Sequence, residues 1–157
     1  MDEVRAGGSC EACRRRKMTM GEILGDCITR QVRLLRRVNP EAEVFCWSDM
    51  LDPHHNAHGD YYLVEGDFTG SWKHVPEDLR IVCWYYQKRK QSLAHFSGLG
   101  FKTLAGAYYD GDTLENPTGW LEALDGTPGP WASCTSLGRT STRFWGSSGT
   151  WCRSGEE

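Results

Sequence analysis

The feature that most constrains the fold is an alternation of strand-like and helix-like segments along the middle of the chain. Three runs of β-branched and aromatic residues predict buried strands, at 44–47, 81–86 and 103–108. Helices are expected at 88–97 and 117–124, after the second and third of these runs. Strands that alternate with helices indicate βα units, so the sequence predicts an α/β fold built on a parallel sheet.

A longer helix is predicted at 19–38, ahead of the first strand. Thr19 and Glu22 have the spacing of a capping box, which satisfies two amide groups at the start of a helix. Pro40 cannot continue the hydrogen-bond ladder and marks the end of this helix. Apolar residues recur at helical spacing and predict one buried stripe, made of Met20, Ile23, Leu24, Cys27, Ile28, Leu34, Leu35 and Val38. A long polar loop is expected between the first two strands.

Composition excludes several classes of protein. The chain has 157 residues, too few for a complete (β/α)8 barrel, which needs roughly 200. Its residues are 25% charged and 39% hydrophobic, as in an ordinary globular protein. No apolar run approaches the roughly 18 residues of a membrane span, and a net charge of -3 argues against nucleic acid as the partner. The seven cysteines lack the pattern of a disulfide framework, so we expect reduced thiols and a cytoplasmic location.

Lys and Arg concentrate at the start of the chain, above all in the run Arg14-Arg15-Arg16-Lys17. Such a run is compatible with a surface for polyanions or with a solvated loop that leads into the next helix. We expect the loop.

Aromatic and acidic residues gather where the three predicted strands end. These residues are Trp47 and Asp49, Trp84 and Tyr85, and Tyr108 and Asp110. The loops of a parallel sheet open at the carboxyl ends of its strands, so a site is expected there. Aromatic rings stack on sugar rings and carboxylates accept hydrogen bonds from hydroxyl groups. The set therefore favours a carbohydrate ligand, with a nucleoside or another polar ligand as an alternative.

Two groups of residues have the chemistry of metal ligands but lack partners in the sequence. Cys10-x-x-Cys13 supplies half of a zinc site, and a second pair of ligands at suitable spacing is missing. His54, His55 and His58 lie in a segment whose proline and glycine predict a loop. We therefore expect neither a metal ion nor another cofactor, and a small metal-binding protein stays as an alternative.

Three short motifs follow one another along the chain: Asp2-Glu3-Val4-Arg5, Ile81-Val82-Cys83-Trp84 and Ala107-Tyr108-Tyr109-Asp110. Taken in this order, they resemble glycoside hydrolase family 20, the β-N-acetylhexosaminidases. Asp2-Glu3-Val4-Arg5 resembles the Asp-Glu pair after the fourth strand of that family's barrel. Ile81-Val82-Cys83-Trp84 is similar to the sixth strand with its sugar-stacking Trp, and Ala107-Tyr108-Tyr109-Asp110 to the Tyr-x-Asp signature of the seventh. The resemblance covers residues 1–128 and implies a partial (β/α)8 TIM barrel with about strands four to seven.

The resemblance also implies a mechanism and roles for individual residues. In that family the acetamido oxygen of the substrate attacks the anomeric carbon, so the acetamido group takes the place of a nucleophilic side chain of the enzyme. Glu3 would protonate the leaving oxygen and Asp2 would orient the acetamido group. Tyr108 would donate a hydrogen bond to the acetamido oxygen, Asp110 would bind sugar hydroxyls, and Trp84 would line the pocket. The His-x-Gly-Gly segment that precedes Asp-Glu in the family is absent here.

Residues 129–157 differ in character from the rest, because Gly, Ser and Thr dominate them. We expect an irregular tail in place of the eighth barrel strand. Read one base out of frame, the codons of 131–135 can encode Gly followed by two apolar residues and Tyr or His. This is a buried-strand pattern, and it suggests a frameshift near Gly129.

The sequence therefore predicts a glycosidase-like domain at 1–128 and an irregular, frameshifted tail at 129–157. Its full-length form would hydrolyse O-glycosidic bonds, with a carbohydrate as partner and neither nucleic acid nor membrane. The chain as given should be inactive and should self-associate through open sheet edges. A non-catalytic carbohydrate-binding remnant is the alternative function.

Overall fold

The computed structural model describes residues 10–58, 66–108, 113–127 and 133–137, the last range by its backbone alone. The chain divides into two compact units, Met1–Leu79 and Arg80–Glu157. Within the described ranges, none of the helices combines the length and the apolar character that crossing a membrane would require.

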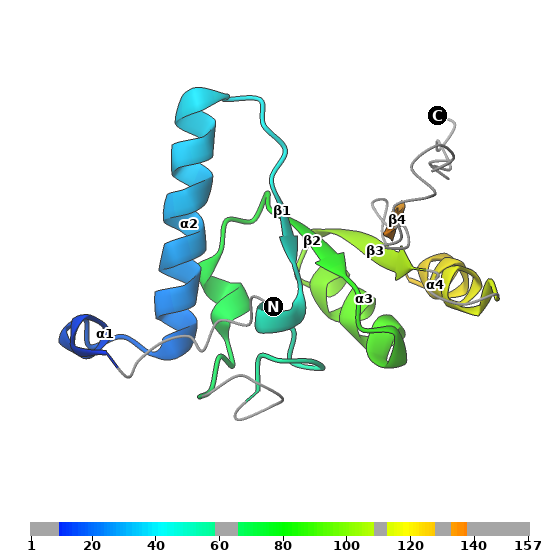
Figure 1. The fold of residues 1–157 in the computed structure, drawn as a ribbon, viewed down its shortest axis with the longest axis horizontal. Helices are drawn as coiled ribbons and strands as arrows, with labels where there is room; N and C mark the ends of the chain where they lie inside the picture. The colour runs from blue at the N-terminus through cyan, green and yellow to red at the C-terminus, as the bar shows by residue number, and fades with distance from the viewer. Residues whose placement is uncertain (1–9, 59–65, 109–112, 128–132, 138–157) are drawn as a thin grey trace. The chain divides into compact units, whose positions relative to one another are not determined.

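The first unit is built around one long helix (Figure 1). Its elements are α1 (Glu11–Arg15), α2 (Met20–Val38), the short strand β1 (Phe45–Trp47) and the 3-10 helices η1 (Asp49–Leu51) and η2 (Ser71–His74). The predictions of α2 and of the first strand are confirmed to within one residue. Arg14 and Arg15 belong to α1, so the expectation of a loop was wrong for these two residues. Arg16 forms an ion pair with Asp26 that ties the end of α1 to α2.

The predicted capping box at the start of α2 is confirmed. The Glu22 amide donates to Thr19 Oγ1 at 3.2 Å, and the Thr19 amide donates to Glu22 Oε2 at 2.7 Å. The hydrogen bond from the Thr19 backbone amide lowers the pKa of the Glu22 carboxyl. The stability that this bond contributes is therefore present above the ordinary carboxyl pKa and lost as the pH falls through the lowered value.

Replacing Thr19 by Ala should lower the free energy of unfolding by about 1 kcal/mol, because the Glu22 amide loses its acceptor. The measurement is the midpoint of urea unfolding at neutral pH. Thr19→Ser keeps the hydroxyl and serves as the control, with a midpoint close to the parent. Equal midpoints for Thr19→Ala and the parent would contradict the capping role.

The buried stripe predicted on α2 is wrong for its second half. Leu34, Leu35 and Val38 are 60%, 52% and 89% exposed, whereas the buried residues of α2 are Gly21, Gly25 and Val32. Glycine explains the difference, because α2 approaches η2 so closely that a Cβ at Gly25 would overlap His74. Met20 and Leu24, in the first half of the stripe, do pack against a small core of Ala57 and Phe68.

The loop predicted between the first two strands is more ordered than its polar composition indicates. Its backbone forms η1 and η2, and Leu51, Phe68 and Leu79 are fully buried. The Ser71 hydroxyl donates to the Met50 carbonyl at 3.0 Å and links the two 3-10 helices.

The second unit is a parallel α/β sheet, as the sequence predicts. It contains β2 (Arg80–Cys83), η3 (Tyr86–Lys88), α3 (Arg89–Gly98), β3 (Lys102–Tyr108), α4 (Glu115–Asp125) and β4 (Ser133–Leu137). Cys83 lies opposite Ala105 in the pair β2–β3, and Ala105 lies opposite Cys134 in the pair β3–β4. Both pairs are parallel, and each strand neighbours the next strand in the chain.

Both helices of this unit contact the central strand β3 and also contact each other. Helix α3 connects β2 to β3, and α4 connects β3 to β4. When such connections are right-handed and the strands are added in one direction, the helices lie on the same face of the sheet, which agrees with the contact between α3 and α4. The core lies between them and the sheet, around Leu93, Phe96 and Trp120. Phe96 and Phe101 meet edge to face, with ring centroids 6.1 Å apart.

Strand β4 corrects the expectation of an irregular tail. Ser133–Leu137 pairs with β3, although these five residues are mostly small and polar. Backbone hydrogen bonds to a neighbouring strand do not depend on side-chain type, so β3 can order a segment whose composition gives no strand signal. The rest of the predicted tail lies outside the described residues.

Candidate functional site

Three of the predicted site residues lie at one edge of the second unit's sheet. Trp84 and Tyr85 follow the last residue of β2, and Tyr108 is the last residue of β3. Because β2 and β3 run parallel with Cys83 opposite Ala105, both strands present their carboxyl ends at the same edge. Trp84 and Tyr85 are half-buried, and Tyr108 is 37% exposed. The predicted aromatic edge is therefore present.

Helix α4 fixes the end of β3 through a residue that sequence reasoning missed. The Tyr108 amide donates to Asn116 Oδ1 at 3.0 Å, in the first turn of α4. The sequence does contain a signal for this role, because Asn116 precedes Pro117 near the start of a predicted helix. The side chain of an asparagine in such a position often forms a hydrogen bond with nearby backbone. This bond holds the backbone that carries the Tyr108 side chain.

The loop after β2 is fastened to α4 by Tyr86 and Arg89. The Tyr86 hydroxyl donates to the Glu115 carbonyl at 3.1 Å, and Arg89 Nε donates to the Gly119 carbonyl at 2.9 Å. The Arg89 guanidinium also stacks 4.1 Å from the centre of the Tyr86 ring. Tyr86 is therefore a structural residue, and its contacts restrain the loop that presents Trp84 and Tyr85.

Trp47 and Asp49 belong to the first unit. Trp47 ends β1 and is 46% exposed, and Asp49 begins η1 and is half-buried. Burial, with the charge of Asp49, raises the pKa of the neighbouring Cys46 thiol to about 11. Trp47 and Asp49 supply the two residue types that the sequence predicts for a sugar subsite, an exposed indole and a carboxylate.

The segment after η1 contains a buried aspartate that binds the neighbouring backbone. Asp52 is fully buried, and its Oδ1 accepts a hydrogen bond from the His54 amide at 2.8 Å. Its carbonyl accepts from the His55 and Ala57 amides at 3.0 and 3.1 Å. Asp52 therefore organises the turn that follows η1, which is a structural role close in sequence to Asp49.

The structure gives no support to a metal centre in its described part. Among residues 10–58, 66–108 and 113–127, no three His, Cys, Asp or Glu side chains come together at metal-ligand spacing. His55 is buried, and this burial lowers the pKa of its imidazole.

Asp2, Glu3 and Asp110, which complete the predicted site, lie outside the described residues.

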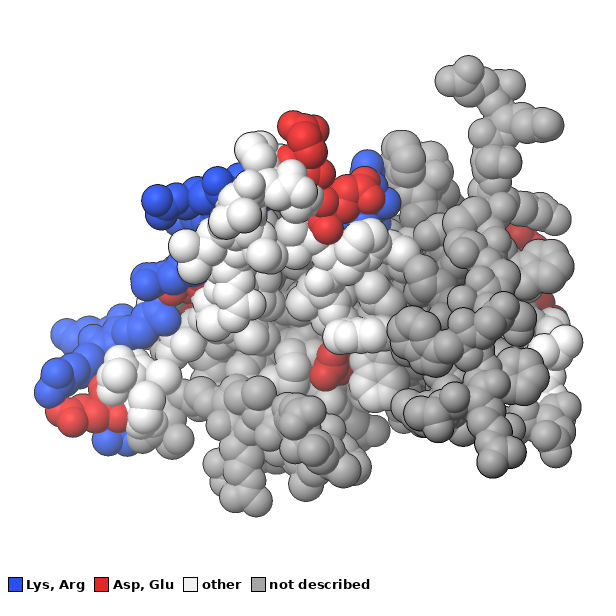
Figure 2. All heavy atoms as spheres, turned by 45° about the horizontal axis from the view of Figure 1, so that its top comes forward, with Lys and Arg blue, Asp and Glu red and all other residues white. Residues whose placement is uncertain are grey.

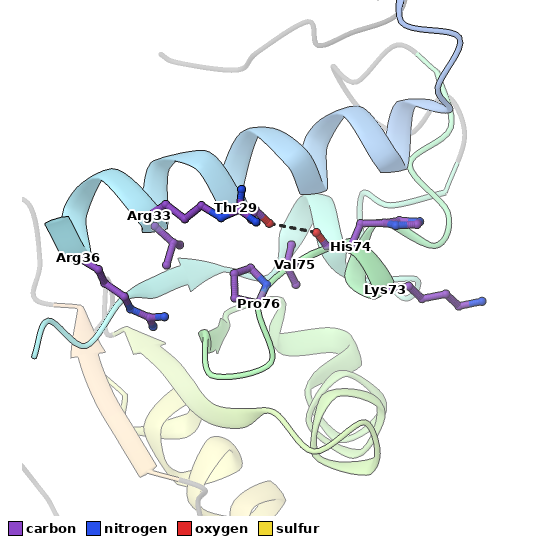
Figure 3. Close-up of a pocket in the computed structure, with 8 residues that line it drawn as sticks. Thr29, Arg33, Arg36, Lys73, His74, Val75 and Pro76 are labelled. Atoms are coloured by element: carbon purple, nitrogen blue, oxygen red, sulfur yellow. Dashed lines mark hydrogen bonds between the residues drawn. The ribbon is translucent and has the colours of Figure 1, made fainter. Parts of the chain in front are cut away.

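A second candidate is an open pocket of about 430 Å³ in the first unit, between α2 and the segment after η2 (Figure 3). It is lined by Thr29, Val32, Arg33, Arg36, Lys73, His74, Val75 and Pro76. The Thr29 hydroxyl donates to the His74 carbonyl at 3.2 Å and closes one end. Arg36 is paired with Asp78 at 2.6 Å, and Lys73 extends away from Arg36 in Figure 3.

This pocket belongs to a broader basic surface. Lys and Arg side chains gather over α1 and α2 (Figure 2). Asp26, on α2, is bonded by both Arg16 and Arg30, and these bonds lower the pKa of its carboxyl. Ion pairs thus neutralise part of the surface, so its charge alone does not define an anion site.

The aromatic edge of the second unit is the stronger candidate, because the fold itself creates it. Aromatic rings at the ends of two neighbouring strands suit a ligand with apolar ring faces. Comparison of the chain with protein-family models and with curated proteins found no match.

Proposed function

We propose that the chain is the C-terminal half of a (β/α)8 glycosidase-like catalytic domain. In its full-length form this domain hydrolyses O-glycosidic bonds. N-acetylhexosamines are the substrate class favoured by the resemblance to glycoside hydrolase family 20.

The observation that carries the proposal is the strand order of the second unit. Parallel strands β2, β3 and β4 follow one another in chain order, and α3 and α4 join them. A (β/α)8 barrel is wound in this way, whereas a doubly wound sheet reverses its strand order at a switch point. The proposal equates β1, β2, β3 and β4 with barrel strands five to eight.

The aromatic edge supports the same proposal. Active sites of (β/α)8 barrels lie at the carboxyl ends of the strands. Trp84 and Tyr108 follow or end neighbouring strands at that edge, and Asn116 holds the backbone of Tyr108. A hydroxyl placed on restrained backbone is suited to the role proposed for Tyr108, which is to donate a hydrogen bond to the acetamido oxygen.

The remaining roles follow from the motifs. Glu3 is the general acid that protonates the leaving oxygen, and Asp2 orients the acetamido group that attacks the anomeric carbon. Asp110 binds sugar hydroxyls, and Trp84 stacks on the sugar ring. Trp47 and Asp49, in the first unit, are assigned to sugar binding because the sequence pairs an aromatic ring with a carboxylate there.

The proposal includes a frameshift near Gly129. Strand β4 occupies 133–137, which overlaps the codons whose shifted reading encodes a buried-strand pattern. Sequencing the gene on both sides of the reading frame tests this directly. An upstream half-barrel in the same frame, with an apolar eighth strand in the shifted frame, is the expected result. Absence of an eighth-strand pattern from every frame would contradict the frameshift.

The sugar site is tested on the chain itself by ligand-detected NMR with chitobiose. Trp84→Ala should abolish the saturation transfer to the sugar, because the stacking surface is lost. Leu121→Ala is the control, since Leu121 is 48% exposed on α4 and lies outside the proposed site. Equal saturation transfer in Trp84→Ala and Leu121→Ala would refute the site. Sugar binding without hydrolysis by a restored, full-length barrel would favour a carbohydrate-binding remnant.

A further inference from the structure

Two cysteines lie three residues apart at the start of α1. Cys10 is the N-cap residue and Cys13 lies three positions further on, and the Cys13 amide donates to Cys10 Sγ at 3.4 Å. With 1.5 Å rise per residue and a radius of about 2.3 Å, residues three apart on a helix have Cα atoms about 5 Å apart. Disulfides form at Cα separations of roughly 4.4–6.8 Å, so the spacing of this pair is compatible with a disulfide.

Both residues lie at the surface, since Cys10 is exposed and Cys13 is partly exposed. The hydrogen bonds from Cys13 lower the pKa of the Cys10 thiol, and the charge of Arg14 acts in the same direction. The thiolate is the form of cysteine that attacks disulfides. Cys10 therefore has the features of an attacking thiol, and Cys13 is placed to resolve the product.

Ion pairs hold the helix that carries the two thiols. Arg16 holds the end of α1 on α2 through Asp26, and Arg15 pairs with Glu11 inside α1. Within the described ranges, the two thiols do not belong to any group of three metal-ligating side chains. Two thiols at this spacing can undergo reversible oxidation to a disulfide without any further residue.

We propose that Cys10 and Cys13 form a thiol–disulfide exchange site that closes into an intramolecular disulfide when it meets a low-molecular-weight disulfide. The Cys10 thiolate attacks one sulfur of that disulfide, so a Cys10 mixed disulfide forms and one small thiolate leaves. The Cys13 thiol then loses its proton, and its sulfur attacks Cys10 Sγ and expels the second small thiolate. Two protein thiols are oxidised by two electrons, and one small disulfide is reduced to two thiols. This proposal is independent of the glycosidase proposal.

The test uses the full chain, glutathione buffers of graded ratio, acid quenching and tryptic mass spectrometry. Trypsin cuts after Arg5 and Arg14, so peptide 6–14 contains Cys10 and Cys13 and no other cysteine. Peptide 18–30 contains Cys27 alone, an exposed thiol that serves as an internal control. Peptide 6–14 should lose two hydrogen atoms and carry no glutathione, as an internal disulfide requires. This should occur at a concentration of oxidised glutathione about ten-fold lower than the concentration at which half of Cys27 is modified.

Two variants separate the steps. Cys13→Ser should trap glutathione on Cys10, because the resolving thiol is gone. Cys10→Ser should slow the modification of peptide 6–14 about ten-fold, because the activated thiol is gone. The proposal is overturned if the parent peptide accumulates glutathione adducts, links to another cysteine, or stays reduced when Cys27 is half modified.

Discussion

In a restored, full-length barrel, replacing Glu3 by Gln is expected to lower turnover by at least about 100-fold for glycosides with poor leaving groups. Glutamine is nearly the same size but has no proton to give to the leaving oxygen. Substrates whose leaving group departs without a proton should keep most of their rate. The measurement is kcat/KM for a series of aryl glycosides of graded leaving-group pKa.

Glu11→Gln is the matched control for this experiment. Glu11 lies eight positions further along the chain, and its carboxylate is exposed and paired with Arg15. Its replacement should leave all the rates within about two-fold, since surface ion pairs of this kind contribute little. Equal losses for good and poor leaving groups in Glu3→Gln would show that Glu3 is not the acid.

The second large effect is expected on stability. Gly25→Ala should lower the free energy of unfolding of the first unit by about 1–3 kcal/mol or more. The added Cβ would lie 2.7 Å from the His74 carbonyl oxygen, and it would also overlap the His74 Cβ. Backbone atoms cannot move aside as a flexible side chain can, so α2 must shift away from η2. The midpoint of urea unfolding, followed by circular dichroism, measures the loss.

Gly98→Ala separates this packing effect from the general preference of helices for alanine. A Cβ at Gly98, the last residue of α3, meets open space. The substitution should leave stability unchanged or raise it by up to about 1 kcal/mol. An unchanged midpoint in Gly25→Ala would mean that α2 and η2 are not packed as described.

Local signals were sufficient to predict most of the regular elements. The capping pair Thr19 and Glu22 located the start of α2, because both hydrogen bonds form within one turn. The β-branched and aromatic runs located β2 and β3, because these strands are buried among their neighbours. The parallel arrangement followed from the alternation with helices, which leaves the chain few ways to connect consecutive strands.

The errors came from contacts that no local pattern encodes. The hydrophobic stripe of α2 predicted the buried face, but close approach to η2 at Gly25 decided it instead, and Leu34 and Val38 are exposed. Strand β4 was missed because its partner β3 orders it through the backbone. The aromatic residues at the strand ends were found from the sequence, whereas the supporting role of Asn116 depends on how α4 returns to β3.

The serial order of β2, β3 and β4 also has a consequence for how the protein is made. The pairs β2–β3 and β3–β4 each join strands that are separated by a single α-helix, so both pairings connect parts of the chain that are close in sequence. Short sequence separations reduce the entropy lost when a loop closes, and they favour rapid folding. The β2–α3–β3 segment can therefore assemble as soon as it leaves the ribosome, and α4 and β4 can add to it in the order of their synthesis.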